Sequence, residues 1–373
     1  MWAMIVKEFR QLRRDRRTLA MMIALPVLLL VVLGYAASFD VSSIPVAVAG
    51  PGSAAVARTL PRPYHVVTSD PAAGRSWAQD QLRDGHAAVA VVTSAGRPLA
   101  VLIDGSQLFT AQAAEGSLSK AFSTPPGAAF IRPTVIVLYN PKLTTSAVMI
   151  PGLAGVVLVF IGTIITSLGV VRERQSGTLE QLAVMPLRPR DVFLGKIVPY
   201  FAVAAADLAI VLGIGIAVFG VPFRGSPAVF ALGALLFLFV TLGVGVLIST
   251  VSQNQGQAIQ LAVMVMLPQV LLSGLIFPLA SIAAGVRWIA YLLPLTYFNE
   301  IARGVMLRAE PIGPLWAPLT FLAALGLAVG TLAILRFRSY LAPARGRTGK
   351  GRVGTDRHAG ALLEGAHADG RAQ

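Results

Sequence analysis

The chain of 373 residues contains no cysteine, four histidines and few charged side chains, which make up 13% of the sequence. The absence of cysteine excludes disulfides, thiolate nucleophiles and cysteine-based zinc sites. The four scattered histidines leave little for other metal chemistry. Apolar residues are in excess: hydrophobic residues make up 55% and the mean hydropathy is +0.72, values typical of a membrane protein.

Motifs for catalysis and nucleotide binding are also missing. Gly349-Lys350 lacks the spacing of a phosphate-binding loop, and no strand precedes it. The sequence contains no serine nucleophile elbow, no HExxH zinc motif and no paired-carboxylate cleft. We therefore predict that the chain is not an enzyme and has no catalytic, cofactor-binding or metal-binding residues of its own.

Long uncharged runs predict six transmembrane helices. A bilayer core of roughly 30 Å needs about 20 apolar helical residues. The run from Gly225 to Val286 is long enough to cross twice, with a polar hinge at 252–257. The run from Ile197 to Phe223 is interrupted only by Asp207. The predicted spans are 18–38, 147–171, three helices within 197–280 (about 197–219, 228–250 and 258–280) and 317–336.

The first span is preceded by a basic leader, residues 1–17. Because this leader is long and the apolar run exceeds that of a secretory signal, we predict an uncleaved signal-anchor. Apolar residues of the leader recur at helical spacing between basic ones, which predicts an amphipathic helix lying in the membrane interface. The alternative is a cytoplasmic cap whose charges only set the topology.

The distribution of basic residues predicts the orientation. With both termini cytoplasmic, the leader, the 172–196 loop and the tail together carry nineteen Lys and Arg, and the short outer segments carry four. The other eight lie in 39–146, a segment too long to influence orientation. The positive-inside rule therefore predicts cytoplasmic termini. Charges beside the spans meet membrane lipids, so we expect no nucleic-acid partner.

Residues 39–146 have the composition of a soluble domain, with eight basic and six acidic residues. Short apolar runs at 44–49, 65–68, 87–92 and 99–103 predict strands, separated by helical patterns at 53–60, 74–84 and 107–122. This alternation predicts a small extracytoplasmic α/β domain with a partly parallel sheet. Ser106 in Asp104-Gly105-Ser106 is the expected N-cap of the third helix. The domain can bind substrate, contact a periplasmic adaptor or cover the exit.

The loop at 172–196 is the most informative segment. The charged residues Arg172, Glu173 and Arg174 follow directly after the second span. Gly177 then interrupts the helical pattern, and Thr178 is the expected N-cap of a short helix. The apolar residues among the charges allow this helix to dock into a groove on another protein. The alternative is a positively charged loop that only sets the membrane topology, but such a loop needs no capped amphipathic helix. The predicted docking residues are Arg172, Glu173, Arg174, Gly177, Thr178, Leu179, Glu180, Leu182 and Pro186.

At this point the chain resembles the integral membrane permeases of ABC-2 type transporters, over about residues 1–340. Gln175 departs from the pattern, since the family often has a second glutamate there. The large loop between spans one and two places the chain nearer the subgroup that has this feature. The matching pieces are 172–174, 177–182, 186–188, 195–200, Leu138-Tyr139-Asn140-Pro141, Pro151-Gly152, 273–278 and 294–297.

The resemblance implies a half-transporter that forms a homodimer or pairs with a paralogous permease in the bacterial cytoplasmic membrane. A separate cytoplasmic ABC ATPase, which holds ATP and Mg²⁺, would drive it. The 172–196 loop would be the coupling helix, with Glu173, Thr178, Glu180 and Leu182 at the contact. Residues 281–316 resemble the outer re-entrant helices of the family, with an interfacial aromatic anchor as the alternative. Residues 337–373 are expected to be a disordered basic cytoplasmic tail.

Polar and small residues inside the predicted spans have two possible roles. Asp207 lies near the middle of span three, where a charge costs at least about 2.5–3.5 kcal/mol. It serves either in the transport pathway or in a helix–helix hydrogen bond, for which Gln260 and Gln269 are the candidates. Small residues permit close helix packing. The glycines concerned are Gly152, Gly155, Gly162, Gly213, Gly215, Gly243 and Gly245.

The sequence thus predicts an α-helical polytopic membrane protein with six transmembrane helices and an inserted extracytoplasmic α/β domain. We expect an ATP-driven exporter subunit, whose substrate can be a drug, lipid, glycolipid or ion. One alternative is a proton-coupled secondary transporter that uses Asp207. The other is a membrane sensor or scaffold with a ligand-binding outer domain.

Overall fold

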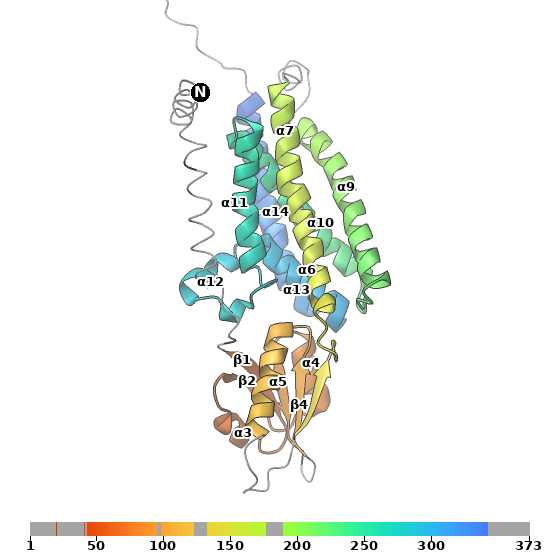
Figure 1. Cartoon of the computed structure of the whole chain (residues 1–373), viewed down its shortest axis with the longest axis vertical. Helices are drawn as coiled ribbons and strands as arrows, with labels where there is room; N and C mark the ends of the chain where they lie inside the picture. Colours follow the sequence, from red (N-terminus) through yellow and green to blue (C-terminus); the bar gives the residue numbers. More distant parts are fainter. Residues whose placement is uncertain are drawn as a thin grey trace, which may run out of the picture.

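The computed structural model describes residues 20, 41, 43–94, 98–122, 133–176 and 189–341. It consists of an α/β domain stacked on one end of a long helical bundle (Figure 1). We call this end of the bundle the domain end and the opposite one the loop end. The leader, the predicted first span apart from residue 20 and the tail after Leu341 lie outside the described residues. The prediction of a disordered tail from residue 337 is wrong for 337–341, because these residues continue the last helix of the bundle.

The α/β domain has a five-stranded sheet in the order β2-β1-β3-β4-β5. β1 pairs in parallel with β2 and β3, β3 with β4 is antiparallel, and β4 with β5 is parallel, so the predicted partly parallel sheet is confirmed. The strands are β1 (Ile44–Ala49), β2 (Tyr64–Asp70), β3 (Val89–Val92), β4 (Ala100–Asp104) and β5 (Thr134–Leu138).

Helices cover both faces of this sheet, because side chains alternate between the faces along each strand. Val46, Val48 and Ile103 face α3 (Ser53–Thr59) and α5 (Leu108–Phe122). Ala47, Ala90 and Leu102 face α4 (Arg75–Arg83). The sequence analysis missed β5, a short edge strand that follows a crossover through α5.

Five helices of the described part of the chain are long and apolar enough to cross a membrane. The first of them runs without interruption over α6 (Thr145–Phe160), the π-helical η1 (Ile161–Ile165) and α7 (Thr166–Gln175). The others are α9 (Pro189–Ala217), α10 (Pro227–Val251), α11 (Gln255–Leu272) and α14 (Ile312–Leu341). Five of the six predicted spans therefore correspond to helices.

The fifth predicted span, 258–280, is wrong at its end, since α11 stops at Leu272. Gly274 has a φ of 78°, and irregular backbone continues to the short 3₁₀ turn η2 (Leu279–Ser281). Side chains replace the lost helical bonds: Asn299 donates to the Ser273 carbonyl at 3.4 Å and Arg303 to the Gly274 carbonyl at 3.0 Å. Irregular backbone inside an apolar helical bundle requires hydrogen-bond partners of this kind.

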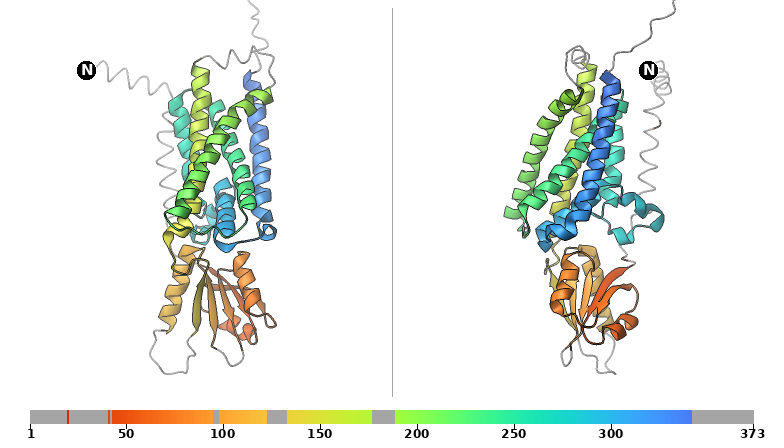
Figure 2. Two further views of the ribbon diagram at one scale, coloured as in Figure 1. Left: turned by 90° about the vertical axis from the view of Figure 1, so that its right-hand side faces the viewer. Right: turned by 180° about the vertical axis from the view of Figure 1, so that it is seen from behind.

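The partners belong to a group of short helices that closes the domain end of the bundle (Figure 2). They are α12 (Ala284–Ala290), α13 (Pro294–Arg303) and the π-helical η3 (Gly304–Arg308), and we call them the roof. α13 packs on α6, α10 and α14, and its Phe298 stacks on Phe237 of α10 with ring centroids 4.6 Å apart. α13 and η3 are therefore part of the bundle core, whereas α12 lies at its edge (Figure 1) and leaves Trp288 exposed.

Glycine lets the central helix α10 approach its neighbours closely. A Cβ on Gly162 of η1 would lie 2.9 Å from the carbonyl carbon of Thr241, and one on Gly245 would collide with the Gly162 carbonyl oxygen. The packing role holds for six of the seven glycines. It is wrong for Gly213, which has no neighbouring atom within 4 Å of its Cβ position among the described residues.

Candidate coupling site and domain joint

At the loop end, Arg174 caps a neighbouring helix. Its guanidinium donates to the carbonyl of Ser249 at 3.4 Å and to that of Ser252, both at the C-terminus of α10. Carbonyls in the last turn of a helix have no partner within the helix, and a cation there also interacts favourably with the helix dipole. Arg174 therefore joins α7 to α10.

A second contact joins α7 to α11. The Gln255 side chain donates to the Gln175 side-chain oxygen at 2.9 Å. The turn between α10 and α11 is itself closed, because Asn254 accepts the Gln257 N–H and the Gln257 side chain accepts the Gln253 N–H, both at 2.9 Å. We call the contacts of Arg174 and Gln175 with this turn the loop-end clamp.

The structure brings three of the predicted docking residues together at the end of α7. Arg172 is exposed, whereas Glu173 and Arg174 are half-buried. The other predicted residues lie outside the described part of the chain: Gly177, Thr178, Leu179, Glu180, Leu182 and Pro186. The predicted loop bounds 172–196 are too wide, because residues 172–175 belong to α7 and residues 189–196 to α9. The described structure shows only these two helical ends, and the docking role stays a prediction.

Asp207 lies half-buried in the middle of α9. Among the described residues it has no hydrogen bond to Gln260 or Gln269, so the expected pairing is wrong. The physical reason is the arrangement of the helices: α9 packs on α6, α10 and α14, whereas α11 lies on the other side of α7 (Figure 1).

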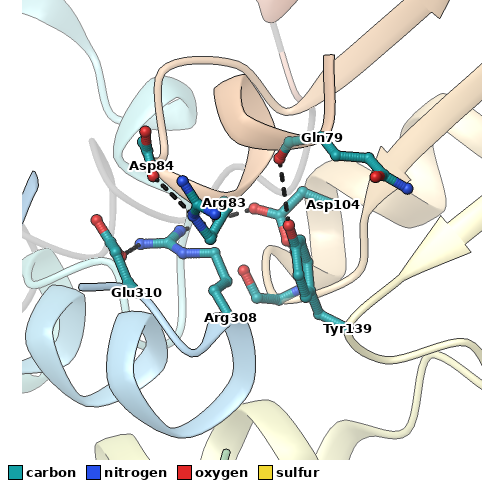
Figure 3. Close-up of polar contacts among 8 residues, drawn as sticks. Gln79, Arg83, Asp84, Asp104, Tyr139, Arg308 and Glu310 are labelled. Atoms are coloured by element: carbon teal, nitrogen blue, oxygen red, sulfur yellow. Dashed lines mark hydrogen bonds and ion pairs between the residues drawn. The ribbon is translucent and has the colours of Figure 1, made fainter. Parts of the chain in front are cut away.

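At the domain end, a buried arginine joins the roof to the α/β domain (Figure 3). Arg308, the last residue of η3, lies 2.7 Å from a carboxylate oxygen of Glu310 and 3.7 Å from one of Asp104 at the end of β4. The three side chains are 7%, 3% and 0% exposed. The guanidinium also lies beside Gly85 in the turn after α4. We call these contacts the domain joint.

The local backbone positions Asp104 for this contact. Its Oδ1 accepts the Ser106 N–H at 2.9 Å, while the Gly105 N–H donates to the Leu138 carbonyl of β5 at 3.0 Å. The expected N-cap role of Ser106 is wrong, since α5 begins at Leu108 and the Ser106 hydroxyl accepts no helix N–H. The turn serves to hold the carboxylate.

Two buried carboxylates share one cation in the joint. Burial raises the pKa of Asp104 and of Glu310 above their ordinary values, and the charge of Arg308 opposes both shifts. Burial lowers the pKa of Arg308, but the two carboxylates outweigh this and raise it. Burial, with Asp104 adding to it, raises the pKa of Tyr139 to about 12. The joint is therefore held by charges that are largely removed from water.

A second connection leads from the domain into α6. The Asn140 amide group donates to the Gly105 carbonyl at 3.4 Å and to the Thr144 carbonyl at 3.1 Å. Its oxygen accepts the N–H of Thr144, the N-cap of α6, at 3.0 Å. The Leu138-Tyr139-Asn140-Pro141 motif thus fixes the sheet to the helix that leads into the predicted coupling loop.

The sequence analysis missed the domain joint. There, Arg308 was only one of the four basic residues of the outer segments used to predict the membrane orientation, and Asp104 was only part of a turn before a helix. The one available signal is a pair of opposite charges, Arg308 and Glu310, in a largely apolar stretch. Their partner in the distant α/β domain cannot be found without the fold.

Apolar helices long enough to cross a bilayer, closed at one end by a roof and an attached α/β domain, define a multi-pass membrane protein. The model of the ABC-2 family transporter protein matches residues 16–335. The chain belongs to this family, which confirms the resemblance found in the sequence. It is therefore a transport protein and a permease component, not an enzyme, and the ATPase is a separate subunit.

Relatives in Escherichia coli (strain K12) agree with this. The chain is 29% identical over 337 residues to "Probable multidrug ABC transporter permease YbhS", covering 83% of this chain and 88% of that one. It is 28% identical over 361 residues to "Probable multidrug ABC transporter permease YbhR", covering 91% and 98%. With "Inner membrane transport permease YhhJ" it shares 33% identity over 183 residues, covering 48% and 49%.

Proposed function

We propose that the chain is the permease subunit of an ATP-driven exporter in the bacterial cytoplasmic membrane. A cytoplasmic ABC ATPase docks on the 172–196 loop, and the permease works as a homodimer or with a paralogous permease. In this arrangement the loop end is cytoplasmic and the α/β domain lies outside. The observation that carries the proposal is the continuous helix from Thr145 to Gln175, which connects the predicted docking loop with the α/β domain.

The geometry supports transmission of movement along this helix. At one end α7 leads into the loop, and at the other Asn140 fixes α6 to the sheet. η1 lies between them, packed against α10 at Gly162. A π-helical turn inside a transmembrane helix is a frequent feature of functional sites. ATP-driven displacement of the loop biases the bundle between two arrangements of these packed helices.

The substrate class follows from the relatives. The names of YbhS and YbhR include the word multidrug, and the two proteins align with most of this chain. We infer that the substrates are small apolar or amphipathic molecules. The ATPase partner sets this proposal apart from a proton-coupled transporter and from a sensor.

The test is a detergent pull-down of the tagged chain with an ABC ATPase encoded beside it. We expect wild type to recover the ATPase and the double variant Glu180→Arg/Leu182→Asp to lose it. Arg58→Glu, an exposed change on α3, is the control and should recover the ATPase as wild type does. Failure of wild type to recover any ATPase, with the protein eluting as a single folded species, would overturn the proposal.

A further inference from the structure

The loop-end clamp gives Arg174 a role different from the one its sequence context implies. In the sequence Arg174 belongs to the charged group expected to face the partner. In the structure its guanidinium turns toward the bundle and binds the carbonyls of Ser249 and Ser252. Hydrogen bonds from a charged donor are stronger than those between neutral groups. The end of α7 is thereby fixed to the end of α10.

The clamp extends to α11 through an independent contact. Gln255 is the first residue of α11 and binds Gln175, the last residue of α7. Because Asn254 and Gln257 close the intervening turn, α10 and α11 meet α7 as one unit. A displacement of the loop is then imposed on α11 as well as on α7.

The far end of α11 reaches the roof. After Leu272 the chain leaves the helix, and Asn299 and Arg303 of α13 hold its first irregular carbonyls. The Asn299 amide group also donates to the Ser273 hydroxyl at 3.1 Å. α11 therefore links the loop end to the irregular segment 273–278, and it does so while packing along α7, η1 and α6.

We propose that Arg174 is a positioning residue that couples the docking loop to α11, and not a contact to the ATPase. ATP-driven motion then moves two helices, α7 and α11, and the second one shifts the 273–278 segment beneath the roof. The inference rests on the proposed function, because it requires an ATPase bound to the loop.

A single-cysteine reporter tests this without knowledge of the substrate. The chain has no cysteine, so Ile276→Cys provides the only thiol of the permease. Its rate of labelling by a maleimide is measured in nanodiscs that contain the permease and the copurified ATPase, without nucleotide and with ATP and vanadate. We expect a nucleotide-dependent change in rate in the reporter chain.

In Arg174→Leu we expect the nucleotide-dependent change in the labelling rate of Ile276→Cys to fall about tenfold, while the ATPase still copurifies. The reason is that a hydrogen bond to a charged group changes an equilibrium constant by about a factor of ten. Arg174→Lys, which keeps a charged donor, should retain most of the change in labelling rate, and Gln255→Leu should reduce it. The matched control is Thr250→Val. Thr250 lies in the same turn of α10, and within the described part of the chain its hydroxyl donates to the Leu247 carbonyl of its own helix, so the variant should respond as the reporter chain does.

Three results overturn the inference and leave the proposed function intact. They are loss of the ATPase in Arg174→Leu, a full nucleotide response in Arg174→Leu with the ATPase bound, and no nucleotide response in the reporter chain with the ATPase bound. Failure of the reporter chain to recover any ATPase is a failure of the proposed function itself. Elution as a single species shows for each variant that it has folded.

Discussion

Arg308→Met should open the domain joint. The substitution keeps much of the side-chain volume but removes the only guanidinium that lies between Asp104 and Glu310 in the described structure. Both carboxylates are almost completely buried, so each is left without a compensating charge. Removing one partner from a buried ion pair costs about 3–5 kcal/mol. This equals roughly a hundred- to several-thousand-fold increase in the fraction of molecules in which the joint is open.

Hydrogen exchange measured by mass spectrometry can detect this opening. The two informative amides are those of Ser106, which donates to Asp104, and Glu310, which donates to the Gly304 carbonyl at 3.0 Å. We expect exchange in peptides that contain them to accelerate by roughly the factor given above, because exchange of protected amides follows the opening equilibrium. Peptides from β1, an internal strand paired on both sides, should stay close to wild type and serve as the internal reference.

A neutral version of the joint provides the control. In the triple variant Asp104→Asn/Arg308→Met/Glu310→Gln no charge is left uncompensated, so most of the protection should return. Unchanged exchange at both amides in the single variant would refute the reasoning. Equal acceleration in the single and triple variants would show that the arginine acts through packing and not through charge.

Three further predictions concern pH, packing and the intramembrane acid. Since the pKa of Asp104 is raised on folding, its contribution to the free energy of unfolding is greatest below its ordinary value of 3.8 and is lost as pH rises through the raised value. Asp104→Asn should therefore gain thermal stability relative to wild type as the pH rises above 4, and a difference in unfolding temperature that stays constant with pH would contradict this. Gly162→Ala should lower the unfolding temperature, because overpacking typically costs about 1–3 kcal/mol, whereas Gly213→Ala, whose Cβ would meet no atom of the described residues, should be neutral or stabilising. Asp207→Asn should leave the ATPase rate of the assembled complex unchanged, and a complete loss of that rate would favour a carboxylate that must ionise.

Much of the architecture can be predicted from local pattern. An uncharged run of twenty or more residues can be satisfied in a bilayer only as a helix, so the spans follow from composition. Short β-branched runs between helical patterns likewise predict four of the five strands. β5 was not predicted, because its five residues form an edge strand with half-buried and exposed side chains and so lack the pattern of a buried strand.

The sequence analysis placed the end of the fifth span too late, because Ser273 to Phe277 continue the uncharged run, and it overlooked a local stop signal. Gly274, with a φ of 78°, suits the position after a helix end, and Pro278 has no N–H to continue the helix. What the sequence could not show is that polar groups on α13, about thirty residues later, satisfy the carbonyls that a continued helix would bond itself.

The sequence by itself determined the family, the helices of the bundle and the α/β domain, since each depends on periodicity or on motifs within one short segment. Only the tertiary structure decided what the isolated charges do. Arg174 caps α10, and Arg308 is buried against Asp104. The physical reason is that the low dielectric of a buried site makes an ion pair strong and an unpaired charge costly. The partner is therefore chosen by the fold, which brings together residues that are far apart in the chain.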